Sequence, residues 1–142
     1  MKIQTILLAA TFLFMLSCTT ASNEGIDEKT TQTVLDHHWE TFVNNDLEGV
    51  MEDYTEESVL ITPDVTYRGL KEIRQNFIRV FKSFPVDGGK LTLNKSIVVQ
   101  DVGYILWEAD VPEFKLLYAT DSFIIRNGKI IRQTFAGVVE PK

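Results

Sequence analysis

The clearest structural pattern in the sequence is the run Leu116-Leu117-Tyr118-Ala119-Thr120-Asp121-Ser122-Phe123-Ile124-Ile125. It is rich in β-branched and aromatic residues, so it predicts a β-strand. Side chains alternate between the two faces of a sheet, and one face is therefore predicted to carry Leu117, Ala119, Asp121, Phe123 and Ile125. The opposite face is predicted to carry Leu116, Tyr118, Thr120, Ser122 and Ile124. Asp121 thus lies on the more apolar face.

A carboxyl group on an apolar face is held where its charge is disfavoured. If that face packs against helices, burial raises the pKa of Asp121 unless a hydrogen-bond donor or a cation compensates. The neutral acid can donate a hydrogen bond into a pocket. The alternative is a structural role, in which Asp121 accepts a hydrogen bond from a backbone amide or pairs with an arginine.

Three further β-rich runs accompany this strand, at residues 91–100, 104–111 and 129–139. Turn residues separate them, and Asn127-Gly128 is among the strongest short signals for a hairpin. The second half of the chain therefore predicts an antiparallel meander.

The first half has a helical period instead. Apolar residues recur at helical spacing from about residue 30 to 43, in a short segment that Asp46 caps, and from Leu70 to Phe81. A short strand is predicted at residues 58–62. Helices followed by a meander favour the α+β class, with an antiparallel sheet that carries helices against one face.

His38 is a second titratable group on an apolar face. It lies four residues after Val34 and four before Phe42, so it belongs to the inner stripe of the first helix, with His37 at its edge. One interpretation is a hydrogen-bonded core histidine. The other is a functional site, because His38 and Asp121 intrude on faces that are expected to confront each other.

Composition narrows the function classes. The chain has 142 residues, of which 44% are hydrophobic, and 20 acidic residues outnumber 14 basic ones for a net charge of -6. This length fits one globular domain plus a targeting segment. The acidic balance disfavours nucleic acid as a partner. Adjacent histidines on a helix point about 100 degrees apart, so His37 and His38 are no metal signature, and we expect neither a metal nor a cofactor.

The N-terminus has the anatomy of a signal peptide. Lys2 precedes an apolar run over residues 3–16, which is shorter than the roughly 20 residues of a spanning helix. Met15-Leu16-Ser17-Cys18 resembles the lipobox of bacterial lipoproteins, in which the cysteine is lipidated and becomes the first mature residue. We therefore expect a signal peptide at 1–17, a flexible tether at 18–30 and a folded domain at 31–142.

Cys18 is the only cysteine of the chain. Once it is lipidated, no thiol remains for a disulfide, a thiolate nucleophile or a zinc site. The expected location is the bacterial cell envelope, with a lipid anchor in the membrane and the domain facing the periplasm or the cell surface.

Two runs carry a family resemblance. Residues 34–73 contain Asn45-Asp46-Leu47 and Arg68-Gly69-Leu70, and residues 121–130 contain Asp121-Ser122-Phe123 and Gly128-Lys129-Ile130. In these runs the chain resembles the SnoaL-like branch of the nuclear transport factor 2-like superfamily. The resemblance implies a cone, in which a curved antiparallel sheet wraps N-terminal helices around an internal pocket, and it implies a homodimer formed through the sheet.

The resemblance also implies site residues. Matched to ketosteroid isomerase, a member of this superfamily, the two oxyanion donors fall on His38 and Asp121 and the general base falls on Thr62. Threonine cannot abstract a carbon-bound proton at neutral pH, so whether the protein is an enzyme stays open. The same matching assigns ligand-binding positions along with Thr62 to Trp39, Tyr54, Trp107, Phe123, Gln133 and Phe135.

Two functions are therefore compared. The first is an envelope lipoprotein domain that binds a small, largely apolar molecule bearing a carbonyl or hydroxyl group, with isomerase-, cyclase- or hydrolase-like activity if a base exists. The second is a non-catalytic dimeric adaptor whose pocket is collapsed and whose strand face at Leu116 to Ile124 forms the dimer contact. An open cavity with Asp121 at its wall would favour the first.

Overall fold

Six strands form one open, curved sheet in the computed structural model, which describes residues 25–142. The predicted signal peptide, Cys18 and residues 18–24 of the predicted tether lie outside the described residues. Between residues 25 and 142, no helix is both long and apolar enough to cross a membrane.

Three helices precede most of the sheet. α1 spans Glu28–Val43, α2 spans Leu47–Glu52 and α3 spans Gly69–Ser83. Asp27 caps α1 by accepting a hydrogen bond of 2.9 Å from the Thr30 amide, so helical structure begins before residue 31, the expected start of the domain. Asp46 caps α2 in the predicted way, at 2.9 Å from the Gly49 amide.

The strands are β1 (Val59–Ile61), β2 (Thr66–Arg68), β3 (Lys90–Val99), β4 (Val102–Asp110), β5 (Phe114–Arg126) and β6 (Lys129–Pro141). Their order in the sheet is β2-β1-β6-β5-β4-β3. The predicted meander is confirmed, and the Asn127-Gly128 turn has positive φ at both residues (51° and 71°), as a type I′ hairpin turn requires.

The predicted antiparallel sheet is confirmed for β3 to β6, and the structure adds one parallel pairing near the β1–β2 edge. β1 pairs in parallel with β6, with Leu60 opposite Gln133, so the sheet is mixed. β1 and β2 form a small antiparallel hairpin, and β2, with only three residues, was not expected from the sequence. β1 therefore lies between β2, its neighbour in sequence, and the last strand, β6.

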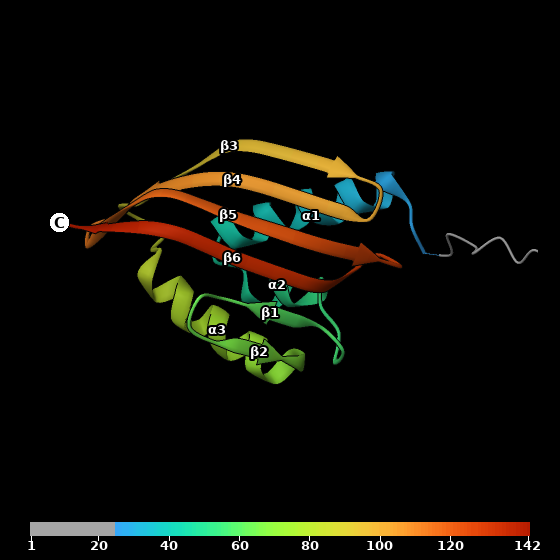
Figure 1. Cartoon of the computed structure of the whole chain (residues 1–142). Coiled ribbons are helices and arrows are strands. Elements are labelled where there is room, and N and C mark those ends of the chain that lie inside the picture. The colour runs from blue at the N-terminus through green and yellow to red at the C-terminus, as the bar shows by residue number, and fades with distance from the viewer. Residues whose placement is uncertain (1–24) are drawn as a thin grey trace, which may run out of the picture.

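The helices cover the inner face of the curved sheet, as Figure 1 shows. The core lies between the two layers, where Leu35 of α1 and Ile73 of α3 are buried together with Ile105 and Phe123 of the sheet. One layer of helices against one layer of sheet therefore encloses the interior on both sides.

The predicted alternation along β5 fails at its first residues. Leu116 is 2% exposed and Leu117 is 50% exposed, the reverse of the expectation. A β-bulge causes the reversal, because the register shifts against both neighbouring strands and leaves Leu117 as an extra residue. From Ala119 to Ile125 the predicted alternation holds, and Asp121 is buried on the inner face.

Candidate functional site

A cavity of about 450 Å³ lies between the helices and the inner face of the sheet. Its wall includes eight of the residues that the sequence singled out, namely His38, Trp39, Thr62, Trp107, Asp121, Phe123, Gln133 and Phe135. The cavity is lined mainly by aromatic and aliphatic groups, so polar groups at its wall are few.

Asp121 holds two hydrogen bonds from side chains inside this wall. The indole Nε1 of Trp107 donates to its Oδ2 at 2.8 Å, and the amide Nε2 of Gln133 donates to its Oδ1 at 2.8 Å. Burial raises the pKa of the Asp121 carboxyl, while these two donors and nearby His38 offset part of the rise. The carboxyl therefore holds a proton more readily than an exposed aspartate does.

Tyr54 does not line the cavity, contrary to the expectation. Its buried hydroxyl donates to Oε1 of Gln133 from behind the wall, which points the amide nitrogen of Gln133 at Asp121. Burial, together with the charges of Asp121 and Asp53, raises the pKa of the Tyr54 hydroxyl, so this group stays a donor at neutral pH. Tyr54 thus fixes the orientation of a lining residue rather than meeting a ligand itself.

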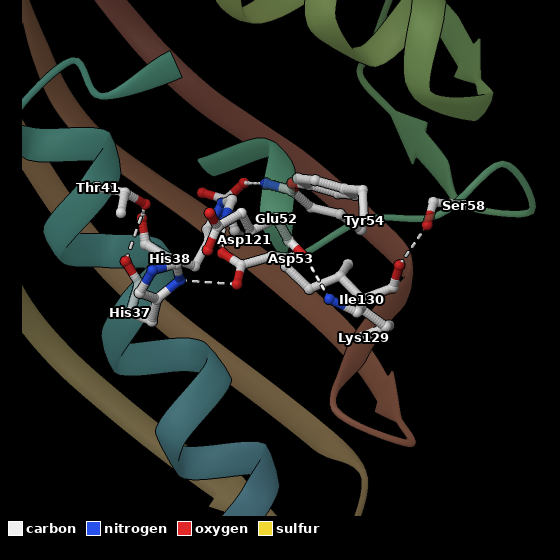
Figure 2. Close-up of polar contacts among 11 residues, drawn as sticks. His37, His38, Thr41, Glu52, Asp53, Tyr54, Ser58, Asp121, Lys129 and Ile130 are labelled. Carbon is white, nitrogen blue, oxygen red and sulfur yellow. Dashed lines mark hydrogen bonds and ion pairs between the residues drawn. The ribbon is translucent and has the colours of Figure 1, made fainter. Parts of the chain in front are cut away.

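His37 and His38 share one buried carboxyl group, which belongs to Asp53 at the end of α2 (Figure 2). Nδ1 of His37 lies 2.8 Å from Oδ1, and Nδ1 of His38 lies 3.1 Å from Oδ2. The backbone carbonyl of Asp53 accepts a hydrogen bond of 2.7 Å from Ile130, which ties the end of α2 to the start of β6.

Within residues 25–142 no group of three or more His, Cys, Asp or Glu side chains could hold a metal ion.

The contact with Asp53 fixes the tautomer of His38. A carboxylate only accepts hydrogen bonds, so Nδ1 carries the proton and Nε2 of the neutral ring carries the lone pair. Nε2 makes no hydrogen bond to residues 25–142. Every fully buried side-chain nitrogen or oxygen among these residues has a partner, so Nε2 is not fully buried. Because His38 lines the cavity, Nε2 borders it. With Nδ1 facing Asp53, Nε2 is the ring nitrogen that is free to act as an acceptor, where the family resemblance implied a donor.

Aromatic rings hold the His38 ring in place. Its centroid lies 5.6 Å from Tyr54, 5.9 Å from Phe77 and 5.2 Å from Phe123, and all three contacts are edge-on. These contacts and the hydrogen bond to Asp53 leave the ring little freedom to turn.

Asn76 and Asp53 are two further site residues that were not predicted from the sequence. Asn76, on α3, is 8% exposed and lines the cavity, and its amide makes no hydrogen bond to residues 25–142. Its position, three residues after Ile73 on the inner stripe of α3, was a usable signal. Asp53 gave no such signal, because its role depends on how α2 packs against α1.

The wall near the β1–β2 hairpin holds the position that the resemblance matched to a base. Thr62 lines the cavity, but its hydroxyl is engaged with the backbone of Val65, at 3.0 Å from the carbonyl and 3.1 Å from the amide. Asp64 is the other carboxyl group at the described wall, and it is exposed to solvent. Neither residue is a buried base.

Comparison with known proteins rests on structure alone, since neither a family model nor a curated protein matches the sequence. A candidate ketosteroid isomerase from Kribbella flavida superimposes with a TM-score of 0.67 at 13% identity, over 80% of this chain and 81% of its own. A candidate polyketide cyclase from Sinorhizobium meliloti gives a TM-score of 0.63 at 17% identity, over 73% and 94%. TerC, crystallised with polyporic acid, superimposes with a TM-score of 0.64 at 16% identity, over 77% of this chain and 92% of its own.

These similarities define the architecture. The chain has the cone fold of the nuclear transport factor 2-like superfamily, as the resemblance implied. At this level of identity the comparison concerns the fold, and one fold supports many functions.

Proposed function

We propose that the protein binds a small, largely apolar molecule bearing a carbonyl or hydroxyl group in the cavity between its sheet and helices. The observation that carries this proposal is an open, mainly apolar cavity of about 450 Å³ with Asp121, His38 and Asn76 at its wall. Ligand sites in proteins commonly measure about 300 to 1,000 Å³ and combine apolar walls with a few polar groups.

The polar groups favour an oxygen-bearing ligand. The amide nitrogen of Asn76 and the neutral form of Asp121 are donors for a carbonyl oxygen, and Nε2 of His38 is an acceptor for a hydroxyl group. The Asn76 amide and Nε2 of His38 make no hydrogen bond to residues 25–142, so a ligand that pairs with them avoids the cost of leaving a buried polar atom without a partner. Binding of polyporic acid by TerC, which shares the fold, agrees with this class of ligand.

The proposed activity follows from the same groups. Asp121 in its neutral form would stabilise negative charge on a carbonyl oxygen, as an isomerase-, cyclase- or hydrolase-like reaction needs. The raised pKa of Asp121 supports this role. Similarity of fold to a candidate isomerase and a candidate cyclase is compatible with it.

Calorimetric titration with 2-naphthol and with naphthalene tests the binding proposal. The two probes differ only in a hydroxyl group, so the pair separates apolar filling from recognition of oxygen. We expect 2-naphthol to bind at least tenfold more tightly, because its hydroxyl pairs with polar groups such as Nε2 of His38 that naphthalene would bury without a partner. Equal affinity for the two probes would show that the polar groups do not recognise oxygen. If neither probe gave heat of binding, the proposed ligand site would be contradicted.

The dimer is proposed through the outer face of the sheet. Tyr118 and Val138 lie opposite each other on β5 and β6 and are 48% and 49% exposed. Leu116 is buried by the bulge and drops out of the predicted contact, while exposed Leu117 replaces it. Sedimentation of the wild type and of Tyr118→Lys checks this: a dimer that the substitution dissociates supports the proposal, and a wild-type monomer contradicts it.

The adaptor alternative has less support than ligand binding. It required a collapsed interior, whereas the structure has an open cavity, and Asp121 is held by side chains rather than by backbone amides.

Anchoring in the cell envelope through lipidated Cys18 is proposed from the sequence of the N-terminal segment. The mass of the processed N-terminus tests it. A diacylated cysteine as first residue supports the anchor, and an unmodified Cys18 in membranes contradicts it.

A further inference from the structure

The base that the resemblance matched to Thr62 has a substitute elsewhere in the cavity wall. Nε2 of His38 borders the cavity with its lone pair, and the carboxylate of Asp53 holds the proton on Nδ1 at 3.1 Å. A carboxylate that orients a histidine in this way also stabilises the imidazolium that forms when the ring takes up a proton. The side chains of both residues are buried, at 5% and 6% exposure, so the pair acts in a weakly screening environment.

The other acid and base groups at the wall are less suited to this role. Both oxygens of Asp121 already accept hydrogen bonds, from Trp107 and Gln133. Asp64 is exposed, and an exposed carboxylate is stabilised by water. The titratable groups around the His38 ring are His37 on its own helix, Asp53 and Tyr54 after α2, and Asp121 on β5.

We propose that His38, oriented by Asp53, is the general base of the cavity and that its substrates are carbon acids, molecules with an acidic C–H next to a carbonyl group or next to a breakable bond to oxygen. This inference rests on the proposed ligand site. His38 is the catalytic residue, because Nε2 meets the substrate, and Asp53 is a positioning residue that acts through His38.

The reaction needs no further reagent. Nε2 of His38 takes the proton, and the electron pair of the C–H bond either enters an enolate, whose oxygen the neutral form of Asp121 would stabilise, or expels an oxygen leaving group. The imidazolium returns its proton to the product or to solvent, which restores the neutral ring.

5-Nitrobenzisoxazole is a suitable probe, because one base suffices for its reaction. Removal of the proton from its C3 carbon forms the nitrile as the ring N–O bond breaks, and the electron pair leaves on a coloured phenolate. We expect the protein to accelerate this opening over buffer. His38→Gln should lose about 100- to 10,000-fold in rate, the usual contribution of a general base.

Two further variants distinguish a role of His38 as the base from a purely structural role. Asp53→Asn presents an amide to Nδ1, which can move the proton to Nε2, so the rate should fall while the affinity for 6-nitrobenzotriazole, an unreactive molecule of similar outline, stays the same. Nitrogen NMR of the His38 ring should show the exchanged tautomer. His37→Gln is the matched control: it removes the other histidine on the same carboxylate, whose side chain is 40% exposed and outside the wall, and should cost less than tenfold.

The outcomes are distinguishable. Failure of both nitro compounds to bind overturns the ligand site and this inference with it. Binding of 6-nitrobenzotriazole without acceleration of the reaction, or acceleration that His38→Gln retains, overturns the base alone and leaves the ligand site intact. Acceleration that Asp64→Asn abolishes and His38→Gln does not would assign the base to the exposed carboxylate.

Discussion

Asp53 and Asp121 are both almost fully buried, at 4% and 5% exposure, yet their surroundings differ in kind. The partners of Asp53 are two histidine rings, which can carry positive charge. The partners of Asp121 are an indole and an amide, which cannot. Burial alone therefore does not set the role of a carboxyl group. Asp53 accepts hydrogen bonds from the two histidine rings and so keeps a proton on the Nδ1 atom of each. Asp121 has only uncharged hydrogen-bond donors, and its pKa at the cavity wall is raised by burial.

The largest effect on stability is expected at Asp53. Asp53→Ala removes the acceptor for both histidines and leaves the buried Nδ1 of His38 without a partner, so we expect a loss of about 3 kcal/mol in the free energy of unfolding at neutral pH. Urea denaturation measures it. Asp36→Ala, at an exposed aspartate of α1, is the control and should change stability by less than about 0.5 kcal/mol. Equal losses in the two variants would show that the shared carboxylate contributes nothing special.

Gln133 provides the corresponding test on the Asp121 side. Gln133→Leu leaves the Tyr54 hydroxyl and Oδ1 of Asp121 without their partner, and each unsatisfied buried group costs about 1 to 3 kcal/mol. Partial relaxation and the added apolar contact reduce the sum, so we expect about 2 kcal/mol. Thr134→Val on the outer face of the same strand is the control, with a change below about 0.5 kcal/mol. A Gln133→Leu variant as stable as the control would mean that the network is not needed for folding.

The pH dependence of stability separates the two carboxyl groups further. The folded-state pKa of Asp121 is raised above the ordinary value of 3.8. The folded protein therefore binds this proton more tightly than the unfolded chain does. The corresponding stabilisation is complete below pH 3.8 and is lost as the pH rises through the raised folded pKa.

Asp121→Asn removes this contribution and should make stability less dependent on pH across that window. Asparagine can keep both contacts, because the Gln133 amide can turn over to accept from it. Urea midpoints measured at several pH values compare the two proteins. Superimposable pH profiles would contradict a raised pKa at Asp121.

The smallest expected effect is at Asn76, which lines the cavity and makes no hydrogen bond to residues 25–142. Asn76→Leu should weaken 2-naphthol by about 2- to 10-fold, the worth of one hydrogen bond, and leave naphthalene unaffected or slightly tighter. Titration calorimetry on both probes gives the ratio. An equal change in affinity for both probes would show that Asn76 affects the shape of the cavity rather than hydrogen bonding to the ligand.

Local pattern was sufficient for much of the fold. Helical spacing located α1 and α3, and Asn127-Gly128 located the β5–β6 hairpin, because these features depend on neighbours in sequence. The parallel pairing of β1 with β6 was missed, since no local pattern determines which distant strand lies alongside. The bulge at Leu117 was missed for a related reason: it is visible only when the strand is paired with its neighbours.

The candidate site was likewise predicted only in part from local sequence patterns. Alternation along β5 placed Asp121 inside, and the helical stripe placed His38 inside. The partners of both groups come from other elements: Asp53 from the end of α2, Trp107 from β4 and Gln133 from β6. Sequence periodicity gives the direction in which a side chain points, whereas its chemical role depends on contacts that only the assembled fold supplies.

Binding of a ligand inside the cone is the property on which the proposed function depends. The chain contains two tryptophans, Trp39 and Trp107, and both line the cavity. Their indole N–H signals in a nitrogen–proton NMR spectrum therefore report directly on its occupancy. Titration with 2-naphthol should shift both signals saturably, while signals from the outer face, such as those of Tyr118 and Val138, stay in place. Indole signals that do not move, with shifts confined to the outer face, would show that 2-naphthol does not enter the cavity.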